Sequence, residues 1–194
     1  MDCEPAYLKT PFSEEDVVSL QIGRLVYLSG VIFTARDAAH QRMWEAVCRN
    51  EELPFDPDGQ VLYYVGPAPA RPGSVIGPAG PTTASRMDPH TEFLLERGLR
   101  GMIGKGKRSP LVRQAMRKYK SVYFGAIEGT AALIARCVRS VDVFAYQDLG
   151  AEAMRRLSVQ EFPVIVVNDI HGGDLYEAGM QKYRRGAPPK RRDT

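Results

Sequence analysis

The sequence lacks the patterns that place a chain in a membrane or outside the cell. No stretch approaches the ~20 apolar residues of a membrane-spanning helix, and the opening residues, Met1-Asp2-Cys3-Glu4, lack the basic start and apolar run of a secretory signal. The formal charge of +3 over 194 residues is too small to indicate nucleic acid binding. The sequence therefore predicts a cytoplasmic protein whose partners include neither a membrane nor a nucleic acid.

Cysteine is scarce and carries no metal-binding spacing. Cys3, Cys48 and Cys137 are far apart, and no Cys-x-x-Cys is present. We expect Cys3 in a loose terminus, and Cys48 and Cys137 in apolar, helical surroundings where a thiol fills the core. Three thiolates could in principle hold an iron–sulfur cluster, but these positions predict no metal site on this chain.

Strand-like and helix-like segments alternate over a length that suits one domain. Strands are expected at 24–29 and 31–34 (hinged at Gly30), 61–65, 74–76, 99–103, 121–124, 138–146 and 162–167, the last being central. Helices are expected from Ser13 to Gly23 and at 38–50, 89–97, 109–119, 129–137, 152–157 and 175–183. Trp44 and Leu111 are assigned to buried helix faces. The alternation predicts an α/β fold in a compact β/β/α layering, with a single domain over residues 1–185 and a basic, disordered tail at 186–194.

One stretch, Gly77 to Asp88, has no periodic apolar pattern and is organised around turns. Its two glycines and two prolines fix sharp backbone bends. Thr82 and Thr83 then stand where a helix would begin, with hydroxyls and free backbone N–H groups facing outward. Such a place suits a carboxylate or phosphate, although a turn with an N-capping threonine explains the same residues.

Two further segments carry candidate binding chemistry. Arg36 follows a strand and precedes a helix, where its planar fork can meet a carboxylate; a surface ion pair is the alternative. His40 by itself is typical of a satisfied or exposed histidine rather than a ligand.

The segment Gly101-x-x-x-x-Gly106-Lys107 nearly matches a phosphate loop, but Arg108 replaces the required Ser or Thr and no buried strand is expected before it. Residues 97–120 contain nine Lys or Arg and no acid. Without interleaved aromatics this favours a solvated helix face or a subunit contact over nucleic acid.

The blocks Gly80-Pro-Thr-Thr-Ala-x-Arg-Met-Asp88 and Phe33-Thr-Ala-Arg-Asp-Ala-Ala-His40 occur here in one chain. Together they resemble the β subunit, or C-terminal domain, of iron–sulfur-dependent class I fumarases and tartrate dehydratases. The resemblance runs from about residue 5 to 180, with further similar segments at 125–129, 148–153, 159–163, 166–169 and 172–176. Glu128 departs from the glycine common in the family, and Ser85 stands at a variable site.

This resemblance implies a swivelling β/β/α domain that works as half of an enzyme. Such enzymes interconvert fumarate and (S)-malate, with a [4Fe–4S] cluster acting as Lewis acid on an α subunit. This chain would be the β subunit of a hetero-oligomer such as α2β2, active only in the complex and without a cluster of its own.

The resemblance also assigns site residues. Arg36, Arg86 and Lys105 match substrate-contacting positions, Thr83 and the turn backbone would contact a carboxylate, and Thr82 matches the proposed proton-transfer residue. Three alternatives stay open: a tartrate dehydratase β subunit, a related hydroxy-diacid dehydratase, and a non-catalytic binding module. The last is disfavoured because a scaffold has no need of converging cations.

Overall fold

The computed structural model describes residues 4–126 and 131–184, so Cys3, Glu128 and the expected tail at 186–194 lie outside the described residues. The strands are β1 (Ala6–Lys9), β2 (Leu25–Thr34), β3 (Val61–Tyr63), β4 (Gly101–Gly104), β5 (Val122–Gly125), β6 (Val138–Ala145) and β7 (Met154–Asn168). The α-helices are α1 (Glu14–Val18), α2 (Asp37–Cys48), α3 (Glu92–Glu96), α4 (Pro110–Tyr119), α5 (Ala131–Arg136) and α6 (Leu175–Tyr183). Two 3₁₀ helices, η1 (Ala84–His90) and η2 (Gln147–Glu152), complete the list. The predicted mixed α/β class is confirmed.

Five strands of the sheet close into a ring. The sheet order is β1-β2-β3-β4-β5-β7-β6, and β7 also pairs with β2. Strands β2 to β5 are parallel, whereas β7 runs antiparallel to both β5 and β2. The 15-residue β7 therefore pairs with both outer strands of the parallel group β2–β5. Residues 162–167, predicted to form a central strand, belong to it.

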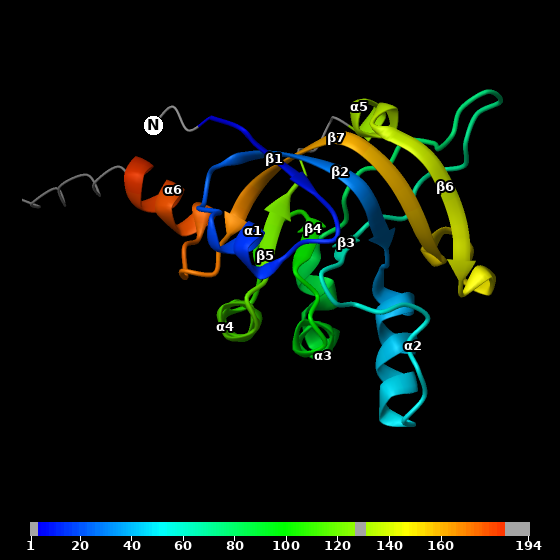
Figure 1. Ribbon diagram of the computed structural model, residues 1–194, viewed down its shortest axis with the longest axis horizontal. Helices are drawn as coiled ribbons and strands as arrows, with labels where there is room; N and C mark the ends of the chain where they lie inside the picture. The colour runs from blue at the N-terminus through cyan, green and yellow to red at the C-terminus, as the bar shows by residue number, and fades with distance from the viewer. Residues whose placement is uncertain (1–3, 127–130, 185–194) are drawn as a thin grey trace, which may run out of the picture.

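The ring separates two apolar cores. Tyr63, Ile103 and Phe124 point to the inner core, together with Leu28 and Phe162. Their neighbours along the same strands face outward to the helices; these are Leu62, Tyr64, Met102 and Tyr123. The helices α2, α3 and α4 lie on one side of the sheet, where they cover this outer set (Figure 1). Strands buried on both faces read as continuous apolar runs, which is why 61–65 and 121–124 were recognisable.

Several local predictions were wrong for identifiable reasons. Residues 152–157, expected as a helix, enter β7 at Met154, because that segment pairs with both β2 and β6 and the pairing outweighs helix propensity. Residues 74–76 form no strand, and β1 was not foreseen. The two strands expected on either side of Gly30 are one strand, β2, with a register shift between Leu28 and Gly30.

Three side chains assigned to the interior lie at the surface instead. Trp44 is 40% exposed and Leu111 is 77% exposed, while Cys48, the last residue of α2, is exposed rather than core-filling. The remaining apolar positions of α4, among them Val112 and Met116, are buried as expected.

A proline-rich loop between β3 and η1 depends on Gly77. A Cβ added there would overlap the carbonyl oxygen of Ala68 and lie 2.5 Å from that of Pro69, and Ala68 N–H donates to Pro78 O at 3.1 Å. We expect Gly77→Ala to destabilise the fold by about 2 kcal/mol and to lower the unfolding midpoint by about 5 °C. Gly179→Ala, where a Cβ meets nothing within 4 Å, is the control and should lower no midpoint. Equal unfolding midpoints for the two variants would show that the loop can move to accommodate a Cβ at residue 77 without loss of stability.

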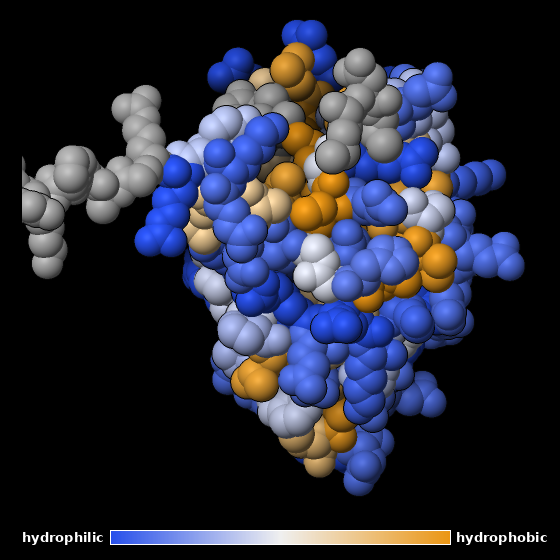
Figure 2. Space-filling model, turned by 90° about the vertical axis from the view of Figure 1, so that its left-hand side faces the viewer, coloured by the Kyte–Doolittle hydropathy of each residue, from blue (hydrophilic) through white to orange (hydrophobic). Residues whose placement is uncertain are grey.

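The face on the α6 side of the molecule is mostly hydrophilic, with apolar residues in small patches (Figure 2). Among the described residues, no helix has the length and apolar character needed to cross a bilayer.

Candidate functional site

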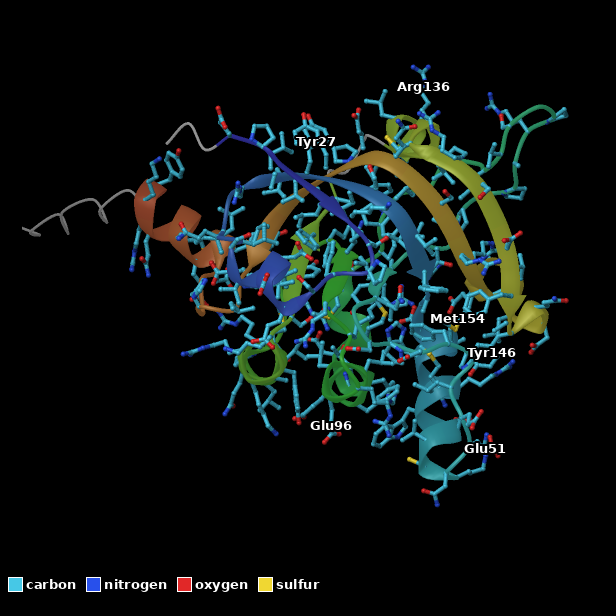
Figure 3. The ribbon with its side chains drawn as sticks, viewed as in Figure 1. Tyr27, Glu51, Glu96, Arg136, Tyr146 and Met154 are labelled. Atoms are coloured by element: carbon cyan, nitrogen blue, oxygen red, sulfur yellow. The ribbon has the colours of Figure 1, made fainter. Side chains whose placement is uncertain are left out.

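Arg36 lies at the junction of β2 and α2, as predicted. Its Nη2 is 3.4 Å from Glu152 Oε1, and the other carboxylate oxygen of Glu152 accepts from Ala38 N–H at 2.9 Å. Gly66 allows the guanidinium to pass close, since an added Cβ would be 2.8 Å from Arg36 Nη1. Glu152 thus caps α2 and orients Arg36 at the same time. It is contributed by η2, which lies beside α2 between the labelled Tyr146 and Met154 (Figure 3).

Asp37 links two of the predicted cations. Its Oδ1 lies 2.8 Å from Arg86 Nε, and its Oδ2 lies 3.8 Å from Arg36 Nη2. Arg36 and Arg86, 50 residues apart in sequence, are therefore held beside one carboxylate. Asp37 and Glu152 were not predicted as site residues. Asp37 adjoins Arg36 in sequence and could have been flagged. Glu152 lies in the family-like segment 148–153, which assigned it no role.

Thr82 lies next to Arg86, whose Nη1 donates to Thr82 Oγ1 at 3.4 Å. A nearby guanidinium favours the deprotonated form of a hydroxyl. The prediction of free backbone N–H groups in this turn was wrong at Thr82, which donates to Tyr64 O at 2.8 Å, and at Ala84, which donates to Lys105 O at 2.8 Å. An anion at this turn would therefore be held chiefly by side chains. Thr83 occupies the N-cap position of η1 without a side-chain capping bond and is exposed.

Lys105 follows β4 directly and runs beside the same turn. Its N–H donates to Thr82 O at 3.1 Å, and Thr83 and Lys105 form a parallel bridge. The backbone thus brings Lys105, which is half-buried, next to the two threonines. All five predicted residues meet at one place, where the carboxyl ends of β2 and β4 adjoin η1.

His40 is fully buried one turn into α2. Its Nδ1–H donates to Arg36 O at 2.9 Å, and its ring meets Tyr64 edge-on with centroids 5.3 Å apart. Burial lowers the pKa of His40 to about 4, despite the opposing hydrogen bond to Arg36 O. The ring is therefore neutral at pH 7. It is satisfied only in part, because its buried Nε2 has no hydrogen-bond partner among the described residues.

The described residues do not fit an iron–sulfur cluster. Over residues 4–126 and 131–184, no three His, Cys, Asp or Glu side chains gather closely enough to hold a metal ion. Cys48 ends α2 in an exposed position, while Cys137 precedes β6, where burial raises the pKa of its thiol and disfavours the thiolate that iron requires.

The segment 101–107, which nearly matches a phosphate loop, adopts another structure and makes other contacts. Gly101–Gly104 is strand β4 rather than a loop, and Lys107 Nζ approaches Met180 Sδ at 3.8 Å. Three arginines of the basic run are paired with acids: Arg100 with Glu14 at 3.8 Å, Arg108 with Asp88 at 2.7 Å and Arg113 with Asp174 at 2.8 Å.

Comparison with known proteins finds relatives that match most of this chain. The chain is 38% identical over 182 residues to a Methanocaldococcus jannaschii protein assigned as L(+)-tartrate dehydratase subunit beta, which covers 91% of this chain and 93% of that protein. It is 41% identical over 152 residues to fumarate hydratase 1, mitochondrial, of Leishmania major, and 36% identical over 157 residues to the anaerobic class I fumarate hydratase of Escherichia coli K12. These two matches cover 77% and 80% of this chain but only 28% and 29% of those proteins.

A family model described as the fumarase C-terminus matches residues 3–179. Because the match spans nearly the whole chain and is joined by hydro-lyase relatives above 30% identity, the chain belongs to the fumarase C-terminus family.

Proposed function

We propose that this chain is the β subunit of a two-subunit hydro-lyase that reversibly hydrates fumarate to (S)-malate. The observation that carries the proposal is the convergence of Arg36, Arg86 and Lys105 around Thr82. The subunit role is supported by the similarity to a relative assigned as a β subunit, which aligns with this chain over 93% of that relative's length. The cytoplasm is the proposed compartment.

The three cations suit a substrate with two carboxylates. Glu152 pairs with Arg36 and Asp37 pairs with Arg86, so both guanidinium groups are already oriented before a substrate binds. Arg36 and Arg86 would bind the carboxylates through their planar forks, with Thr83 adding a hydroxyl contact. Thr82 would move the proton at the carbon next to the departing hydroxyl, since Arg86 already donates to its Oγ1.

The rest of the active site would come from a second chain. The Arg86 side chain is 50% exposed and Thr83 is exposed, so the described residues leave the substrate positions open to solvent. We propose that an α subunit holds the [4Fe–4S] cluster and closes over this face in a hetero-oligomer such as α2β2. A swivelling β/β/α domain over residues 1–185 would allow that closure and exclude water.

The test is anaerobic co-expression with the α-type subunit, with parallel assays of fumarate hydration and tartrate dehydration. We expect fumarate turnover only when both chains and the cluster are present. Turnover by this chain alone, or none by a cluster-loaded complex, would contradict the proposal.

A tartrate dehydratase β subunit is the second candidate function. It is favoured by the relative that matches almost the full chain at 38% identity. Malate and tartrate differ by one hydroxyl group. Turnover of tartrate but not of fumarate in the same assay would therefore move the assignment to this candidate. Binding of diacids without turnover of either by the complex would indicate a binding module or another hydroxy-diacid dehydratase.

We expect Arg86→Lys to weaken substrate binding in the complex. The ammonium keeps the charge but loses the fork that reaches Asp37 and Thr82 together, so KM should rise about tenfold with a smaller fall in kcat. The matched control is Arg49→Lys, at an exposed Arg–Glu pair with Glu51 at the end of α2. Unchanged KM and kcat in Arg86→Lys would remove Arg86 from the site.

A further inference from the structure

Arg108 is the most completely enclosed charge near the site and has no role in the proposed chemistry. Its side chain is 0% exposed, and its Nε lies 2.7 Å from Asp88 Oδ1. Burial alone would lower the pKa of Arg108, but Tyr64 and Asp88 outweigh that effect and raise it. The guanidinium is therefore charged, and its contacts are those of a fixed cation.

Each contact of this guanidinium reaches a segment that carries or supports a site residue. Nη2 donates to Thr91 Oγ1 at 2.7 Å, and that hydroxyl donates to Met87 O at 2.8 Å within η1. Nη1 donates to the Tyr64 hydroxyl at 3.0 Å, while the Tyr64 carbonyl accepts the N–H of Thr82. Asp88, the partner of Arg108, also accepts from Ser109 N–H at 2.7 Å.

The position of Arg108 in the chain couples the two halves of the site. It follows Lys105 by three residues, and its partner Asp88 follows Arg86 by two. The backbone bonds between Lys105 and Thr82–Ala84 form one tie between these segments, and the Arg108–Asp88 pair forms the other. Arg36 lies on the β2–α2 junction, which is linked to the η1 segment by the ion pair between Asp37 and Arg86.

Stability is a poor reason for such a pair. The desolvation of two buried charges cancels much of their attraction, and apolar replacements of similar volume are often as stable. What the pair does supply is orientation, because the guanidinium is hydrogen-bonded through Nη1 and Nη2 and forms a close ion pair, without hydrogen-bond geometry, at Nε.

We propose that Arg108 and Asp88 are positioning residues that hold the Thr82 hydroxyl and the Lys105 segment at their working separation. This inference rests on the proposed function, in which Thr82 and Lys105 act on the substrate. The pair contacts the reacting groups only through the backbone and does not touch substrate.

The test is the double variant Arg108→Met/Asp88→Asn, compared with wild type in the assembled complex. The asparagine carbonyl can still accept from Ser109, and Thr91 can still donate to Met87, so few polar groups are left unsatisfied. We expect an unfolding midpoint close to wild type, a kcat about 100-fold lower, and a KM that changes much less. Arg108→Lys, which keeps the charge without the fork, should recover part of kcat.

The matched control is Arg113→Met/Asp174→Asn, a second Arg–Asp pair, in which Arg113 lies in α4 and Asp174 caps α6. It should leave kcat unchanged. If kcat in both double variants falls only in proportion to the folded fraction, the pair is merely structural and the proposal is overturned.

Amide hydrogen exchange on the full chain gives a readout that needs no turnover. The Arg108 double variant should lose about tenfold protection at the amides of Ala84 and Lys105, while the β2–β7 ladder keeps its protection. Unchanged exchange at these two amides would overturn the inference. A wild-type complex that turns over neither diacid would contradict the proposed function, and exchange would still decide whether the pair holds the two segments together.

Discussion

Replacing Thr82 with valine is expected to lower kcat of the proposed two-subunit hydro-lyase by about 1,000-fold, within the range typical of a lost acid–base group. Valine has the shape of threonine and keeps both backbone bonds of residue 82, to Tyr64 O and from Lys105 N–H. It removes only the hydroxyl that accepts from Arg86. Steady-state kinetics of the complex on fumarate and malate measure the effect.

Three companion variants separate proton transfer from other roles of the turn. Thr82→Ser keeps a hydroxyl and should retain most of kcat. Thr83→Val removes the proposed carboxylate contact and should raise KM with little change in kcat. Ser85→Ala, at an exposed residue outside the proposed site, should behave as wild type. Near-normal turnover by Thr82→Val would show that another group moves the proton.

Acid is expected to destabilise the chain through His40. The pKa of this histidine is about 4 in the folded state, against 6.5 for the unperturbed group, because burial disfavours the charged ring. The unfolded state therefore binds the proton first as pH falls. The contribution of neutral His40 to the free energy of unfolding is fully present above pH 6.5. It declines between pH 6.5 and 4 and is lost below pH 4, a total loss of about 3 kcal/mol.

Denaturant unfolding at a series of pH values measures this loss, and His40→Asn isolates it. The asparagine amide can still donate to Arg36 O but takes up no proton, so the variant should be less stable at pH 7 and less sensitive to acid between pH 6.5 and 4. His171→Asn replaces an exposed histidine and should keep the wild-type slope. Parallel losses in wild type and His40→Asn would assign the acid sensitivity to other groups.

The sequence predicted elements with a strong local pattern and failed where distant strands decide the structure. The apolar runs at 61–65, 121–124 and 162–167 are strands because each is buried on both faces or at the ring closure. Residues 152–157 have helix-forming composition, yet β2 and β6 draw this segment into β7. No local pattern encodes a partner more than 100 residues away.

The same limit applies to the site. Arg36 and Arg86 were recognised from their blocks, but the carboxylate between them and the capping role of Glu152 depend on how η2 packs beside α2. Likewise, the N–H groups of Thr82 and Ala84 looked free because their acceptors, Tyr64 and Lys105, are 18 and 21 residues from them along the chain.

The closure of the ring by β7 has a consequence for how the chain is made. Strands β2 to β5 are synthesised first, and their two outer edges find a common partner only when residues 154–168 leave the ribosome. Until then the nascent chain exposes unpaired strand edges and the inner apolar core, which invite association with other chains. The ribosome-bound intermediate should therefore bind chaperones strongly. The chain should be released from the chaperone soon after Asn168 emerges from the ribosome.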